Sequence, residues 1–252
     1  MPAEGTRHGT HSHPSNRVVF FLPHVTRTCE SSPEGEGILR ALIFANGDPA
    51  TPELVERWLQ PDAIVIAADG GARNVLDAGL TPDTVIGDFD SLPDSLLDPL
   101  ERRGVRFIIH PVHKDETDLE LAIQYALDCG ATDIVIFSAL GGRWDQSLGN
   151  ILLLTLPALD MPARIVEQRQ TMSIIRPGGE ARIDGHEGDT LSLIALGGDA
   201  RGVTIEGCEY PLTDAVLPFG QTLGISNVLT GPTARVRVPD GIVLVIHLRQ
   251  AL

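Results

Sequence analysis

The sequence predicts an α/β fold in two parts, an N-terminal parallel sheet covered by helices and a C-terminal all-β sandwich. From Ile38 to about Gln168, short apolar runs alternate with helical segments, which is typical of β-α units that feed a parallel sheet. The runs are almost uniformly apolar, as expected for a sheet covered on both faces. Beyond Gln168 the helical periodicity ends, and short strands separated by turn residues follow.

The first part is expected to be a Rossmann-like domain over residues 37–167. Its helices have recognisable starts. Thr51 stands before Pro52, as an N-cap before a proline at the first helical position. Ser91 and Thr117 each stand three residues before an acidic residue, as in a capping box, and Thr117 opens an amphipathic segment at 118–128. We expect six strands, at residues 39–45, 63–68, 84–86, 105–109, 133–138 and 163–167.

The second part, residues 168–252, is expected to be the β-sandwich. Its expected strands are residues 171–175, 190–195, 202–206, 235–238 and 242–248. Residues 1–36 hold four of the eight histidines among Ser, Pro, Gly and Thr, without sustained periodicity. We expect a disordered leader there, and metal binding by its histidines is the alternative.

Charge and composition exclude several classes of protein. Nineteen basic and 34 acidic side chains give a formal net charge of −15, which disfavours binding to nucleic acid or to anionic membranes. A polyanionic substrate would need a metal ion or a local basic group. No apolar run approaches the ~20 residues that span a bilayer, so we expect no membrane association and a cytoplasmic protein. The three cysteines, Cys29, Cys129 and Cys208, form no C-x-x-C pair and are expected to be free thiols.

Acidic residues gather in the loops that follow the expected strands. In an open parallel sheet, ligands bind outside the carboxyl ends of the strands, so these loops are expected to meet at one edge. Clustered carboxylates repel one another unless cations lie between them, and loop oxygens suit Mg²⁺ bridged to substrate phosphates. The alternative is that each is only a turn or cap residue. The aspartates in question are Asp69, Asp88, Asp90, Asp115, Asp118 and Asp145.

Individual positions within these loops favour a metal-phosphate site. Asp88 and Asp90 are two residues apart, so both can bind one cation while Phe89 turns inward to the core. Lys114 is the only lysine in the chain and lies inside the acidic cluster, where it can contact phosphate. The alternative is that a composition biased toward arginine contains this one lysine by chance. Arg143 can bind phosphate bidentately or form a surface ion pair. The P-loop, dinucleotide-binding, zincin and α/β-hydrolase motifs are all missing.

Taken together, these blocks resemble the thiamine pyrophosphokinase family. They occur in that family's order and spacing over a region that runs from about residue 38 to the end. The resemblance implies an α/β domain, a β-sandwich, a homodimer with sites between subunits, Mg²⁺ dependence, and conversion of ATP and thiamine to AMP and thiamine diphosphate. The blocks are D-G-G-A at 69–72, G-D-F-D-S at 87–91, K-D-E-T-D at 114–118, G-G-R-W-D-Q at 141–146 with Asn150, and G-I-S-N at 224–227.

The resemblance also implies roles for individual residues. Mg²⁺ would be bound by Asp88, Asp90 and Asp118, which with Asp145 would form the catalytic set. The thiamine site would include Ser226 and Asn227. The nucleotide site would be lined by Asp69, Gly70, Lys114, Asp115, Thr117, Arg143 and Gln146.

The sequence departs from the family pattern at two points, and two other functions compete with the one that the resemblance implies. Position 146 is Gln where many bacterial members have His, so a catalytic histidine there is not required. The only tryptophans are Trp58 and Trp144, which leaves the aromatic side of the thiamine pocket unassigned. A pterin pyrophosphokinase on a similar scaffold is the rival from the same reaction class. A non-catalytic thiamine or nucleotide sensor is the rival from another class.

Overall fold

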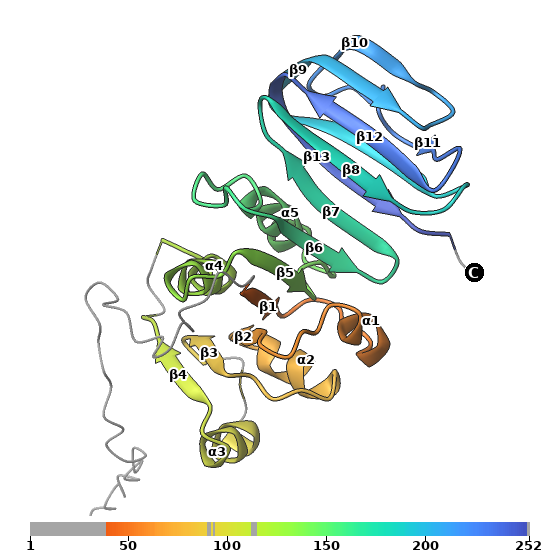
Figure 1. Cartoon of the computed structure of the whole chain (residues 1–252). Coiled ribbons are helices and arrows are strands. Elements are labelled where there is room, and N and C mark those ends of the chain that lie inside the picture. The colour runs from red at the N-terminus through yellow and green to blue at the C-terminus, as the bar shows by residue number, and fades with distance from the viewer. Residues whose placement is uncertain (1–38, 90–91, 93, 112–114, 251–252) are drawn as a thin grey trace, which may run out of the picture.

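Six parallel strands form the N-terminal half of the sheet. The computed structural model describes residues 39–89, 92, 94–111 and 115–250 (Figure 1), so the expected leader lies outside the described residues. The spatial order is β4-β3-β2-β1-β5-β6. All six predicted strands are confirmed to within two residues at each end. They are β1 (Arg40–Phe44), β2 (Ile64–Ala68), β3 (Thr84–Gly87), β4 (Arg106–Ile109), β5 (Asp133–Phe137) and β6 (Ala163–Glu167).

Helices cover both faces of this parallel half. The helices α4 (Asp118–Asp128) and α5 (Trp144–Leu153) pack on the face that carries Ile43, and the opposite face carries Leu42 and Phe44. Because side chains alternate along a strand, each central strand supplies both apolar cores, which explains its uniformly apolar sequence. The helices on the opposite face are α1 (Pro52–Glu56), α2 (Gly71–Asp77) and α3 (Asp94–Arg102).

Two of the predicted helix starts are confirmed. The Thr51 side chain accepts a hydrogen bond from the Leu54 amide at 3.3 Å, with Pro52 at the start of α1. The Thr117 side chain accepts one from the Glu120 amide at 3.2 Å and so caps α4. Such caps satisfy amides that have no partner within the helix. Ser91, the third predicted start, lies outside the described residues.

The C-terminal half is a sandwich of two layers, and the long strand β9 (Thr190–Glu206) belongs to both. The first part of β9 pairs with β13 (Asp240–Leu248), which also pairs with β7 (Gln170–Ile175). The last part pairs with β10 (Leu212–Leu217) and β12 (Thr233–Val238), and β12 pairs with β8 (Gly179–Asp184). The short β11 (Asn227–Val228) pairs with the start of β9. These strands form two layers (Figure 1), and a third hydrophobic core lies between them.

The structure corrects the sequence analysis in the sandwich. Strands predicted separately at 190–195 and 202–206 are one strand, β9, which changes layer where Gly197 and Gly202 adopt φ values of 70° and 72°. Glycine reaches this region without strain, so the strand bends and continues. The strands β8, β10 and β11 were not predicted. Cys208 is a free thiol as expected, and Cys29 lies outside the described residues.

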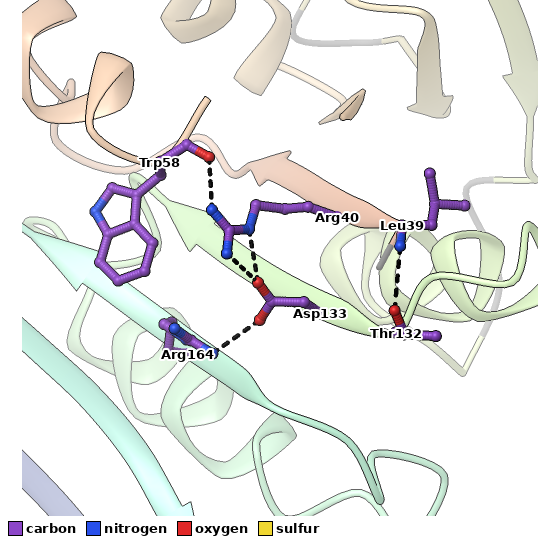
Figure 2. A network of polar contacts seen from close by, with 6 residues as sticks. All are labelled: Leu39, Arg40, Trp58, Thr132, Asp133 and Arg164. Atoms are coloured by element: carbon purple, nitrogen blue, oxygen red, sulfur yellow. Dashed lines mark hydrogen bonds and ion pairs between the residues drawn. The ribbon is translucent and has the colours of Figure 1, made fainter. Parts of the chain in front are cut away.

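A buried ion-pair network joins the amino ends of β1, β5 and β6 (Figure 2). Asp133 accepts a hydrogen bond from Arg40 Nε at 2.6 Å through one carboxylate oxygen and one from an Arg164 nitrogen at 2.8 Å through the other. Both guanidinium groups lie over the Trp58 ring, 5.8 Å and 5.2 Å from its centroid. The network fastens three neighbouring strands at the edge opposite their carboxyl ends.

Candidate active site

A cavity of about 630 Å³ opens at the carboxyl ends of β1 and β5. These strands are neighbours, but the chain leaves β1 for the face that holds α1 and leaves β5 for the face that holds α5. The two loops therefore diverge, and doubly wound sheets bind ligands at such a switch point. The walls come from the segments that follow β1, β2, β3 and β5 and from the starts of α4 and α5.

Three aspartates from separate loops line this cavity. Asp69 follows β2 and is 7% exposed, Asp88 follows β3, and Asp118 is the first residue of α4. Gly87 lies against two of them: a Cβ atom added there would be 2.8 Å from Asp69 Cβ and 3.4 Å from Asp118 Oδ1. Position 87 must therefore stay small if the carboxylates are to keep their positions.

The backbone beside these carboxylates adopts uncommon conformations. Asp69 has a φ of 44° and Phe89 a φ of 64°, both in the left-handed region. Such conformations cost energy in residues other than glycine and cluster at functional sites. Phe89 is partly buried and packs edge-on against Phe107, with ring centroids 5.5 Å apart. This confirms that the residue between Asp88 and Asp90 turns inward.

The remaining predicted nucleotide-site residues divide into three groups. Thr117, Arg143 and Gln146 line the cavity with the three aspartates. Lys114 and the predicted metal ligand Asp90 lie outside the described residues. The cavity walls do not include Gly70, Asp115 or Asp145.

Arg143 and Asp145 form an exposed ion pair at the rim. Arg143 Nε donates to Asp145 Oδ1 at 3.1 Å, and both side chains are more than half exposed. The hydrogen bond from Arg143, and after it one from the Gln146 backbone, lowers the pKa of Asp145 to about 2. The hydrogen bond with Asp145 in turn raises the pKa of Arg143. The surface ion pair considered as the alternative role for Arg143 is therefore present, although Arg143 also reaches the cavity.

Buried amide side chains fix the backbone of the two cavity loops. Asn74 on α2 donates to the carbonyl oxygens of Ala45 at 2.9 Å and Gly47 at 3.2 Å. Asn150 on α5 donates to the Ala139 carbonyl oxygen at 2.7 Å. Sequence reasoning missed Asn74, and the available signal was a polar residue among the sheet-facing positions of a helix.

A second cavity, of about 510 Å³, lies in the sandwich and contains both predicted thiamine residues, Ser226 and Asn227. The Asn227 side chain accepts from the Tyr210 amide at 3.0 Å and donates to the Tyr210 carbonyl at 2.7 Å. Its amide group therefore fixes the Tyr210 backbone. Tyr210 also lines the cavity and is 66% exposed, a residue that sequence reasoning missed.

The fold and the two cavities define a two-part α/β protein with one cavity at the switch point of its sheet and another in its sandwich. Two family models match the chain. The model described as the thiamin pyrophosphokinase catalytic domain matches residues 55–165, and the one described as the thiamin pyrophosphokinase vitamin B1 binding domain matches residues 177–243. The chain belongs to the thiamin pyrophosphokinase family.

Individual relatives agree with this assignment. The chain is 33% identical to the thiamine pyrophosphokinase of Bacillus subtilis over 184 residues, which is 72% of this chain and 86% of that protein. It is 25% identical to thiamine pyrophosphokinase 1 of Oryza sativa over 73% of this chain and 78% of that protein. The crystal structure of the Bacillus subtilis enzyme matches with a TM-score of 0.75 and 29% identity, covering 84% of this chain and all of that one.

Proposed function

We propose that this protein transfers the pyrophosphoryl group of ATP to the hydroxyl of thiamine, giving thiamine diphosphate and AMP. The observation that carries the proposal is the match of both family models, one over each half of the chain. The acidic cavity at the switch point supports a nucleotide site in residues 37–167. The second cavity supports a thiamine site in residues 168–252. We place the reaction in the cytoplasm. Separately, no helix among the described residues is long and apolar enough to cross a membrane.

The first cavity suits Mg²⁺ that arrives with ATP. Among the described residues, no three His, Cys, Asp or Glu side chains form a group that could hold a metal by themselves. Mg²⁺ binds through one or two carboxylates together with waters and substrate phosphates, so Asp88 and Asp118 on the cavity wall fit it. We assign the ion to these two residues and to Asp90, which lies outside the described residues. Bound Mg²⁺ neutralises negative charge on the transferred group.

The remaining predicted residues are proposed to bind and orient the nucleotide. Asp69, Thr117, Arg143 and Gln146 line the cavity. An arginine at its rim suits phosphate because its planar fork donates two parallel hydrogen bonds. The proposed nucleotide set is completed by Gly70, Lys114 and Asp115.

In the proposed reaction, the thiamine hydroxyl oxygen attacks the β-phosphorus of ATP. The bond between that phosphorus and the oxygen shared with the α-phosphorus breaks, and AMP leaves with the oxygen. Positioning and charge stabilisation dominate such transfers. Asp88 is the proposed acceptor for the hydroxyl proton because it lines the cavity, whereas Asp145 lies outside the cavity wall and is paired with Arg143, which keeps the pKa of Asp145 at about 2. Asp145 would then contribute by orienting Arg143.

The second cavity suits the cationic, aromatic character of thiamine. Tyr210 presents an exposed ring beside Ser226, and Glu209 adds a negative charge to the same wall. A thiazolium cation is attracted to the face of an aromatic ring. We therefore propose that Tyr210 supplies the aromatic contact that the sequence left unassigned. Ser226 would contact the substrate, and Asn227 would hold Tyr210 in place.

A homodimer would bring the two cavities together. They share no lining residue within one chain, so a partner's sandwich would face the nucleotide cavity of the first subunit. Exposed apolar side chains recur every fourth residue along α5, at Trp144, Leu148 and Leu152, and offer a contact surface. At thiamine concentrations far below KM, Asp118→Asn should be nearly inactive and Tyr210→Ala should keep about a tenth of wild-type activity. An equal mixture of the two should show roughly a quarter of wild-type activity, because half of the dimers would carry one intact site. No recovery would contradict the shared site.

The decisive experiment measures AMP formed from ATP with and without thiamine and Mg²⁺. We expect AMP only when both are present, and Asp118→Asn should lower turnover by about 100-fold or more. Asp128→Asn, at the far end of the same helix, is the matched control and should stay near wild type. AMP release that requires a pterin alcohol would favour the rival kinase. Thiamine or nucleotide binding without AMP would favour the sensor.

A further inference from the structure

A buried carboxylate lies behind the loop that follows β5. Glu167 ends β6, is 8% exposed, and accepts hydrogen bonds from the amides of Ala139 at 2.8 Å and Leu140 at 3.1 Å through the same oxygen. β5 and β6 pair up to Phe137 and Val166, so Glu167 continues the contact between the two strands just beyond their backbone ladder. Glu167 itself does not line the nucleotide cavity, but residues 139–142 do.

Hydrogen bonds hold the backbone of this loop at several points. The Ser138 and Leu140 carbonyl oxygens each accept from the loop after β1, from Gly47 and Asp48 respectively, both at 2.7 Å. The Gly141 amide donates to the Ser147 hydroxyl at 3.1 Å. Glu167 accepts hydrogen bonds from the amides of residues 139 and 140, which would lose these partners without it.

A carboxylate is a costly choice for a purely structural role at this position. Burial raises the pKa of Glu167 to about 7, its two backbone hydrogen bonds act in the opposite direction, and the charge of Asp48 raises it further. A neutral acceptor would avoid the desolvation cost. Above that pKa the ionised carboxylate forms stronger and shorter hydrogen bonds than a neutral oxygen, and a neutral oxygen at the same place should hold the loop only somewhat less firmly.

We propose that Glu167 is a positioning residue that holds residues 139–142 in the conformation needed to bind ATP. Arg143 and Gln146 follow directly on this segment and line the same cavity, so a shift of the loop would move both. This inference rests on the proposed function, because it assigns the nucleotide to this cavity.

The test measures nucleotide affinity separately from turnover. Misplacement by about 1 Å can cost about 100-fold in rate, so we expect Glu167→Ala to lower kcat/KM for ATP by about that factor while KM for thiamine stays unchanged. Glu167→Gln keeps an oxygen at the same reach and should recover most of the activity. Glu167→Asp withdraws the carboxylate by one methylene and should not. The matched control is Glu180→Ala, an exposed glutamate on β8.

Direct binding of a non-hydrolysable ATP analogue completes the test. Its Kd should rise in Glu167→Ala and Glu167→Asp, and hydrogen exchange should accelerate at residues 139–142 only. If Glu167→Ala does not fold, Glu167→Asp decides: a wild-type Kd and unchanged exchange would overturn the proposal. If the wild type binds the analogue but releases no AMP with thiamine, the proposed reaction fails while the role of Glu167 is still decided by Kd. A wild type that binds no nucleotide overturns both.

Discussion

Replacing Asp133 by Asn should destabilise the fold much more than the loss of an average ion pair. The Asp133 carboxylate is 7% exposed, and its two arginine partners, Arg40 and Arg164, are 16% and 24% exposed. Burial lowers the pKa of Arg164, and the nearby Arg40 charge lowers it further, so Asp133 is what keeps two cations together in this place. Asn would leave both positive charges without a counter-charge.

The expected loss is about 3 kcal/mol in the free energy of unfolding, at the low end for breaking a buried pair, because the Trp58 ring and carbonyl still contact the arginines. Urea unfolding followed by tryptophan fluorescence measures it. The control is Asp184→Asn, whose partner Arg182 and own side chain are 65% and 69% exposed, with an expected loss below about 1 kcal/mol. Equal losses in the two variants would refute the reasoning that burial makes this network important.

Three further predictions concern the sites. Burial raises the pKa of Glu167 in the folded state to about 7, from an ordinary value of 4.5, so the folded state binds the proton more tightly than the unfolded state. The stability of the wild type relative to Glu167→Gln should therefore fall by about 3 kcal/mol as the pH rises from 4.5 to 8. Urea midpoints of the two proteins that change in parallel with pH would contradict this. Tyr210→Ala should raise KM for thiamine about tenfold and leave KM for ATP unchanged, as steady-state kinetics would show. Thr117→Ala should lower the free energy of unfolding by about 1 kcal/mol, because it removes the cap of α4. Thermal unfolding measures this loss, and Thr132→Ala, at an exposed loop position, is the variant for comparison.

Much of the parallel half was predictable because its signals are local. Asp69, Asp88 and Asp118 each lie next to a strand or helix end that the sequence marks clearly, and the topology of a parallel sheet brings such ends to one edge. The inward turn of Phe89 followed from its position between two carboxylates. These inferences needed no knowledge of which strands are neighbours.

The parts that sequence reasoning missed depend on neighbours that the chain order does not reveal. Glu167 acts on Ala139, 28 residues away, through the pairing of β5 with β6. The Tyr210 backbone is held by Asn227, 17 residues away, across a loop of the sandwich. The long strand β9 was divided in two because its glycines resemble a turn, and only the partner strands on each side show that the chain continues.

The direct hydrogen bonding between β6 and β7 limits how the protein can move. Glu167 pairs with Gln170, so only a two-residue reversal separates the parallel half from the sandwich, and the ladder continues from one into the other. Opening a hinge there would break the backbone hydrogen bonds of a continuous sheet. Substrate entry and product exit should therefore rely on local loop displacements, because the continuous sheet keeps the two cavities at a fixed angle to one another.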